Sequence, residues 1–90
     1  MSNEVYTNHP NFGLLYRICL LDEASELFAT LYAQRLFFIV KQPKGGPLEF
    51  MPVGRTDARV LVEQQLRSLK RNGKYEDYGV LQSTHQQTFQ

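Results

Sequence analysis

The side chains of this chain that could act as metal ligands or nucleophiles are few and scattered. Its two histidines, His9 and His85, lie far apart, and neither has a cysteine or carboxylate at the spacing typical of metal sites. His9 precedes Pro10 and is expected in a turn, whereas His85 is expected on a helix. Cys19, the one cysteine, lies inside an apolar segment, which predicts a buried and inert thiol. The sequence therefore predicts neither an enzyme nor a site for a metal or a cofactor.

The other short polar motifs have ordinary structural explanations. Gly45 and Gly46 follow Lys44, but no Gly-Lys-Ser/Thr sequence comes after them, so they indicate a hairpin turn and not a phosphate-binding loop. Three carboxylates surround a polar break and are expected to be solvated. Four cations fall at the end of a predicted helix, where the helix dipole favours them; a weak contact with nucleic acid is the alternative. The carboxylates are Asp22, Glu23 and Glu26, and the cations are Arg67, Lys70, Arg71 and Lys74.

The composition indicates one small folded domain, or a core with an appendage. Ninety residues are too few for two independent cores, and 42% hydrophobic residues suffice for one. Ten Lys and Arg against nine Asp and Glu argue against a nucleic-acid-coating protein and against an acidic disordered tail. No apolar run reaches the roughly 20 residues that span a bilayer, and the polar residues 1–10 are not typical of a secretory signal. Because one cysteine cannot form an internal disulfide, we expect a cytoplasmic protein.

The aromatic content is high for so short a chain. Five tyrosines and six phenylalanines exceed what one small core holds, so some rings are expected on the surface. Exposed aromatic residues near arginine are typical of protein interfaces. The aromatic surplus therefore favours a protein that binds other proteins.

The first half of the sequence predicts short β-strands. Its segments are apolar and rich in β-formers, and residues 35–41 carry the strongest such run. A polar break at residues 22–25, a turn near Ala33 and Gln34, and the Pro- and Gly-rich residues 42–47 separate them. The predicted strand segments are residues 12–21, 27–32, 35–41 and 48–53. Several short strands with tight turns favour a small curled sheet or barrel.

Both faces of these strands carry apolar side chains. In residues 35–41, Phe37 and Ile39 project to one face and are expected in the core. Leu36, Phe38 and Val40 project to the other face. One of the two faces must point away from the barrel core, and another part of the chain or a partner is expected to cover it. The residues expected at a protein interface are Tyr32, Arg35, Leu36 and Phe38.

The second half of the sequence predicts two helices. Apolar residues recur at spacings of three and four over residues 56–72, with Thr56 as the expected N-cap and Gly73 as the C-terminal cap. A second helix over residues 75–88 is weakened by Gly79 and must pack on the first helix, the barrel or a partner. Residues 1–53 carry net charge −1 and residues 54–90 net +2. We therefore expect a barrel over residues 1–53 and a two-helix hairpin over residues 54–90.

Five segments of the sequence resemble the cyanobacterial PII-interacting protein X (PipX) family. They are HPNFGLLYRIC (9–19), ELFATLYAQRLFF (26–38), GRTDAR (54–59), LRSLKR (66–71) and QTF (87–89). The resemblance runs from the N-terminus to the last residues, and ELFATLYAQRLFF is long enough to be specific. It implies an α+β fold, in which a small five-stranded Tudor-like (KOW-related) β-barrel is followed by two C-terminal α-helices. This fold agrees with the division predicted from the residues.

The resemblance also implies a non-enzymatic adaptor in nitrogen regulation. At low 2-oxoglutarate, the trimeric signalling protein PII in its ADP-bound form is expected to bind the chain. At high 2-oxoglutarate, PII releases the chain, which is then expected to bind and coactivate the dimeric transcription activator NtcA. The two partners exclude each other, and the small molecules bind the partners. A further transcription regulator, bound through the helices in the PII complex, is implied as well, whereas no direct contact with DNA or a membrane is expected, and the free chain is expected to be a monomer.

The family's partner-binding surface maps onto matching positions of this sequence. In the family, the helices either pack on the barrel or swing away when PII binds, and Gly54 would be the pivot. The implied partner-binding residues are Glu4, Tyr6, Phe12, Tyr16, Arg17, Asp22, Glu23, Tyr32, Gln34, Arg35, Leu36 and Phe38.

Two other functions are consistent with a small barrel. A KOW-type module that binds nucleic acid or the ribosome would need a basic barrel face, whereas this half carries net −1. A Tudor-type aromatic cage for methylated Lys or Arg would need several rings to converge on one pocket. The sequence supplies the rings but leaves their convergence open.

Overall fold

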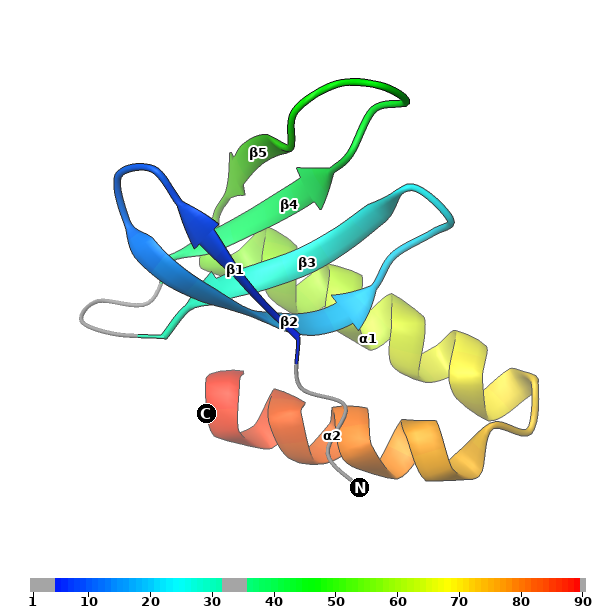
Figure 1. Cartoon of the computed structure of the whole chain (residues 1–90). Coiled ribbons are helices and arrows are strands. Elements are labelled where there is room, and N and C mark those ends of the chain that lie inside the picture. Colours follow the sequence, from blue (N-terminus) through cyan, green and yellow to red (C-terminus); the bar gives the residue numbers. More distant parts are fainter. Residues whose placement is uncertain (1–4, 32–35, 90) are drawn as a thin grey trace.

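The computed structural model describes residues 5–31 and 36–89. Five strands precede two helices along the chain (Figure 1), as predicted. The strands are β1 (Tyr6–His9), β2 (Gly13–Leu20), β3 (Ser25–Thr30), β4 (Phe37–Lys41) and β5 (Glu49–Val53), and the helices are α1 (Arg55–Arg71) and α2 (Tyr75–Phe89). The turn predicted near residues 33–34 lies outside the described residues.

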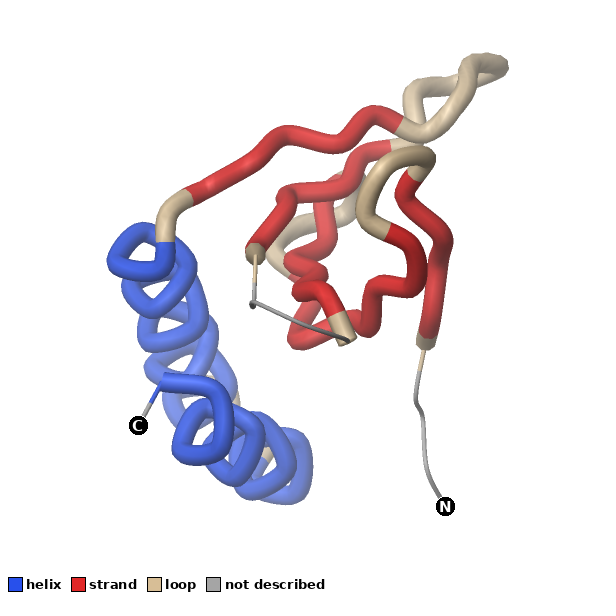
Figure 2. The backbone as a smooth tube through the Cα atoms, turned by 90° about the vertical axis from the view of Figure 1, so that its left-hand side faces the viewer, coloured by secondary structure: helices blue, strands red, loops and turns tan. Residues whose placement is uncertain are grey.

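The strands form one antiparallel sheet in sequence order, β1-β2-β3-β4-β5. The sheet curls into a half-barrel, and both helices pack on its outer side (Figure 2). Its two edge strands, β1 and β5, are bridged by side chains, since the rings of His9 and Phe50 lie 4.7 Å apart between centroids. The α+β fold with a curled five-stranded sheet and two C-terminal helices is therefore confirmed.

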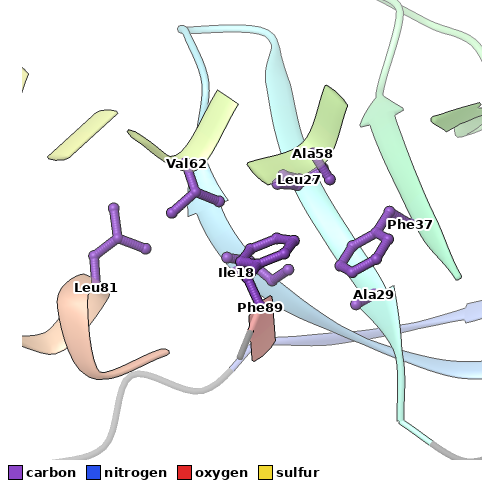
Figure 3. Packing of buried hydrophobic residues seen from close by; sticks show 8 residues of the cluster. All are labelled: Ile18, Leu27, Ala29, Phe37, Ala58, Val62, Leu81 and Phe89. Carbon is purple, nitrogen blue, oxygen red and sulfur yellow. The ribbon is translucent and has the colours of Figure 1, made fainter. Parts of the chain in front are cut away.

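The two faces of the sheet belong to two separate apolar clusters. The inner face holds Leu15, Phe28, Phe38 and Val40, which fill the half-barrel. The outer face contributes to a larger cluster that the helices complete (Figure 3). The eight buried residues of this outer cluster are Ile18, Leu27, Ala29, Phe37, Ala58, Val62, Leu81 and Phe89. The expectation that one sheet face is covered by another part of the chain is thus confirmed, with the helices as the cover.

A β-bulge in β2 assigns its side chains to these two clusters. Arg17 pairs with Phe28 and Cys19 with Leu27, so Ile18 is the extra residue. Ile18 and Cys19 both pack in the outer cluster as a result. Arg17, opposite Phe28, lies on the inner face. The predicted face assignment within β4 is also observed, with Phe37 in the outer cluster and Phe38 in the inner one.

The ends of α1 confirm one predicted cap and correct the other. Gly54 is the N-cap residue, in extended conformation and without a side-chain cap bond, so the prediction of Thr56 as N-cap is wrong. Helical geometry begins two residues earlier than an N-cap at Thr56 implies, because the Ala58 amide already donates to the Gly54 carbonyl. At the other end, Gly73 has φ +73°, and its amide donates to the Lys70 carbonyl. Gly73 therefore ends the helix as predicted.

The helix α2 depends on its neighbours, as expected from its weak apolar stripe. Its buried residues are Leu81, Thr88 and Phe89, and two of them join the outer cluster. His85 Nε2 lies 3.2 Å from Glu63 Oε2 on α1, which links the two helices. Of the three supports considered for α2, namely the first helix, the barrel and a partner, the structure shows the first two. None of the helices in the described part of the chain is long and apolar enough to cross a membrane.

Candidate functional site

An apolar hollow of about 300 Å³ opens where the β1–β2 turn meets β4 and β5. Its position follows from the curl of the sheet, which brings the first turn of the chain over the two last strands. Phe50 and Pro52 alternate onto its side of β5, opposite Val40 and Phe38 in the β4–β5 register. The residues that shape it are His9, Phe12, Leu36, Phe38, Phe50 and Pro52.

Aromatic rings converge in this hollow, and the imidazole of His9 lies at their centre. Its centroid is 4.9 Å from that of Phe12, 4.8 Å from that of Phe38 and 4.7 Å from that of Phe50. An aromatic cage for a methylated cation would instead need an open space between the rings. The aromatic rings therefore converge, but the imidazole of His9 lies at the centre, where a cage would leave space for a methylated cation.

His9 also fixes the β1–β2 turn by hydrogen bonds. Its Nδ1 accepts from the backbone amide of Asn11 at 3.0 Å and from that of Phe12 at 3.3 Å. His9 was expected in a turn; it is instead the last residue of β1, and its side chain closes the turn that follows. Gly13, with φ +75°, completes the change of direction into β2.

Three of the predicted partner-binding residues meet at this hollow. Phe12 and Leu36 lie on its rim, with exposed fractions of 50% and 36%. Phe38 forms its floor and is only 3% exposed. The expectation that Phe38 presents its ring on the surface is therefore wrong. Alternation does place Phe38 opposite Phe37, but that face is the filled interior of the half-barrel.

Two further predicted residues form a pair on the outer face. Tyr6 of β1 lies directly opposite Tyr16 of β2. Tyr6 is exposed, whereas Tyr16 is half-buried against the outer cluster. This tyrosine pair therefore lies on the helix-covered side of the sheet and faces away from the hollow.

Arg17 lies on the inner face and is paired. Its Nη1 is 3.4 Å from Glu26 Oε1, and both side chains are partly buried. Glu26 was expected to be solvated beside a loop; instead it belongs to β3, and its partly buried carboxylate faces the guanidinium across the sheet. An arginine held in this way offers its remaining N–H donors in a fixed direction.

The acidic pair lies at the opposite end of β2 from the hollow. Asp22 and Glu23 are exposed in the β2–β3 turn, as expected. Asp22 Oδ1 accepts from the Ala24 amide at 2.8 Å, and this bond lowers the pKa of Asp22 below its ordinary value. Asp22 also lines a second cleft of about 310 Å³, between Ile39 and Met51 of the sheet and Leu61 of α1. The structure thus separates the acidic turn from the aromatic hollow.

The remaining predicted residues lie outside the described part of the chain. They are Glu4, Tyr32, Gln34 and Arg35. Sequence reasoning missed His9, Phe50 and Pro52 as parts of the hollow. A signal was present for two of them, since alternation within residues 48–53 places Phe50 and Pro52 on one face.

Cys19 has the environment predicted for an inert thiol. Burial against the outer cluster raises its pKa to about 12, and the nearby Arg17 offsets this only in part. Within the described residues, no three His, Cys, Asp or Glu side chains gather in a way that could hold a metal ion. What the described surface offers is a set of apolar and aromatic contacts, which suits a protein partner.

A family comparison decides which kind of partner this is. The sequence profile of PII-interacting protein X, PipX, matches residues 3–89. The chain belongs to the PipX family. PII is therefore a partner of this chain, and the family is one of PII-interacting regulators and not a known enzyme family. Comparison with individual curated proteins gave no match.

Proposed function

We propose that the chain is a non-enzymatic adaptor that exchanges between two partners according to the level of 2-oxoglutarate. At low 2-oxoglutarate it binds ADP-bound PII, and at high 2-oxoglutarate it is released and coactivates the transcription activator NtcA. The observation that carries this proposal is the family match over residues 3–89, which includes both the sheet and the helices. The adaptor acts in the cytoplasm and is a monomer when free.

The aromatic hollow supports a role in partner binding. Phe12 and Leu36 expose apolar surface on its rim, while the buried Phe38 supports them from below. A partner side chain that enters such a hollow loses contact with water on several sides, which is typical of interface hot spots. We assign Phe12 and Leu36 to direct contact and Phe38 to the support of that contact.

The chain switches partners by mutual exclusion. If PII and NtcA use the same barrel face, the chain cannot be buried against both at once. The effectors then need only change the relative affinities, and each ~1.4 kcal/mol changes the ratio of the two complexes tenfold. No chemical step and no cofactor on this chain is required.

The helices are proposed to form a separate unit that pivots at Gly54. Gly54 lies between the last strand and α1, and a Cβ built on it would meet nothing within 4 Å. The site is therefore uncrowded, which suits a hinge. The hairpin would dock on the sheet in the free chain and present itself to a further regulator in the PII complex.

The experiment is a pull-down with both partners present. The tagged chain is mixed with PII and NtcA at low or high 2-oxoglutarate, with ADP or ATP. We expect PII in the bound fraction with ADP at low 2-oxoglutarate, and NtcA with ATP at high 2-oxoglutarate. If PII binds equally under all conditions, or if both partners are retained together, the exchange is refuted. Retention of nucleic acid in a salt-dependent manner would instead support the KOW-type alternative.

A further inference from the structure

His9 carries out a task in the β1–β2 turn that Asn or Asp usually performs. Its Nδ1 accepts from the amides two and three residues ahead, those of Asn11 and Phe12. Asn and Asp side chains make this kind of bond through an oxygen, which remains an acceptor at neutral pH. Histidine differs because the accepting nitrogen can itself take up a proton.

The two donors define the protonation state that the turn requires. A ring nitrogen that accepts two N–H groups carries no hydrogen, so the hydrogen of the neutral imidazole is on Nε2. Protonation would add a hydrogen to Nδ1, directed at two amide hydrogens. The imidazolium would have to turn away, and the amides of Asn11 and Phe12 would lose their acceptor.

The surroundings of His9 offer no charged partner among the described residues. The hollow around it is shaped by Phe12, Phe38, Phe50 and further apolar residues. Lys41 and Glu49 neighbour Val40 and Phe50 in sequence and alternate to the other face of their strands. On the inner face, the nearest charges along the sheet, Arg17 and Glu26, pair with each other.

We propose that His9 is a positioning residue of the partner-binding hollow and that it holds Phe12 in place only in its neutral form. Its ring joins the β1–β2 turn to β4 and β5 through Phe38 and Phe50, and its Nδ1 anchors the Phe12 backbone. A proton on His9 leaves the ring among three phenyl groups, which tolerate a cation, but it removes the anchor of Phe12. Partner binding at this hollow therefore depends on the protonation of His9. This dependence rests on the proposed function, whereas the role of His9 in the turn does not.

The free chain provides the first test, without any partner. NMR spectra of the full chain are recorded between pH 8 and pH 5, the range in which histidines change charge. We expect the amide signals of Asn11 and Phe12 to move with the His9 ring signal, with a common midpoint, and to do so unchanged in a His85→Gln variant. Amide signals that stay constant while the His9 ring titrates would overturn the proposal.

Two substitutions separate the acceptor from the ring. His9→Asn keeps an acceptor that does not titrate, and His9→Phe keeps a ring without an acceptor. We expect the NMR signals of the Asn11 and Phe12 amides to be independent of pH in both variants. Their chemical shifts should be those of hydrogen-bonded amides only in His9→Asn. If His9→Phe retains that position, the ring contacts alone hold the turn and the proposal fails.

The binding test uses immobilised PII with ADP at pH 7.5 and pH 5.5. For the unmodified chain we expect affinity to fall about five- to tenfold at the lower pH, the scale of one or two lost hydrogen bonds. PII can itself respond to pH, and that response lowers the affinity of both chains equally. For His9→Asn we expect the affinity to fall by less than about twofold beyond this shared loss. An equal fall for both chains overturns the proton-sensitive binding. Absence of PII binding at every pH, with the NMR titration intact, refutes the proposed function and leaves the role of His9 in the turn.

Discussion

The phenyl rings of Phe37 and Phe89 stack with their centroids 5.3 Å apart and their planes 16° from parallel. This contact joins the end of α2 to β4, across the outer cluster that Figure 3 shows. Arg55 reinforces it, because its Nη1 donates to the Thr88 carbonyl at 3.2 Å and its guanidinium lies 5.5 Å from the centre of the Phe89 ring. The last turn of α2 is thus fastened to β4 and to Arg55, at the same end of the hairpin as Gly54.

We expect Phe89→Ala to detach the end of α2 and to lower the free energy of unfolding by about 2–3 kcal/mol. Burial of a phenyl ring is lost, and the value lies at or just below the range for fully buried core phenylalanines because Phe89 keeps 8% of its surface exposed. Urea denaturation measures the change, and hydrogen exchange should accelerate in α2. Val80→Ala, at a side chain that is 66% exposed, is the matched control and should change stability by less than about 0.5 kcal/mol. Equal effects of the two substitutions would contradict the fastening role of Phe89.

Two glycines of the helical hairpin should respond in opposite directions to alanine. Gly73 has φ +73°, so Gly73→Ala forces a side chain into the left-handed region and should cost about 1 kcal/mol. Gly79 lies within α2, where a Cβ would meet nothing within 4 Å, so Gly79→Ala should stabilise by about 0.5–1 kcal/mol. Thermal unfolding of both variants measures these changes in stability. A stabilised Gly73→Ala chain would show that the helix does not end there as described.

Glu63 should make stability dependent on pH on the acidic side. Its pKa is lowered by a hydrogen bond from Arg59, at 3.1 Å, and by His85. A carboxyl group whose pKa is lower in the folded than in the unfolded chain contributes fully above its unfolded-state pKa. That contribution is lost as the pH falls through the folded-state pKa. We therefore expect Glu63→Gln to lower the melting temperature at pH 7, with the difference from the parent chain closing as the pH falls below about 4.

Glu23→Gln is the control for this titration, because it changes an exposed loop carboxylate of the same type. Its melting temperature should follow the parent chain at all pH values. A Glu63→Gln chain whose melting temperature differs equally at pH 7 and at pH 3 would point to a packing effect, and the ion pair would then contribute nothing measurable.

Cys19 should react slowly with thiol reagents in the folded chain. Its pKa of about 12 leaves very little thiolate at pH 8, and the thiolate is the reactive form. We expect alkylation by iodoacetamide to be at least about a hundredfold slower in the folded chain than in urea. Mass spectrometry of timed samples measures both rates. Comparable rates would mean that β2 opens readily and exposes the thiol.

Local signals in the sequence predicted the elements well. Strand-forming runs and the spacing of apolar residues predicted the observed helices and strands from β2 onward, and Gly73 was identified as the end of α1. The assignment of Phe37 and Phe38 to opposite faces followed from the two-residue period of a strand. These features depend on neighbours in the chain, which a sequence displays directly.

How deeply the side chains on each face of the sheet are buried could not be predicted, because burial depends on the curl of the sheet. Phe38 was expected at the surface, yet the curl makes its face the interior and gives the other face to the helices. The place of His9 depends on the same curl, which brings the first turn onto Phe50 of the last strand. Glu26 was misplaced because β3 begins two residues earlier than the predicted segment, at Ser25.

The central claim is that PII binds the rim of the aromatic hollow. Surface plasmon resonance on immobilised PII with ADP tests it most directly, with the parent chain, Leu36→Ala, Phe12→Ala and the Val80→Ala control, all first checked for an unchanged fold. We predict at least about tenfold weaker binding for Phe12→Ala, a smaller loss for Leu36→Ala, and a change below about twofold for Val80→Ala. Parent-like affinity of both rim variants would contradict the claim.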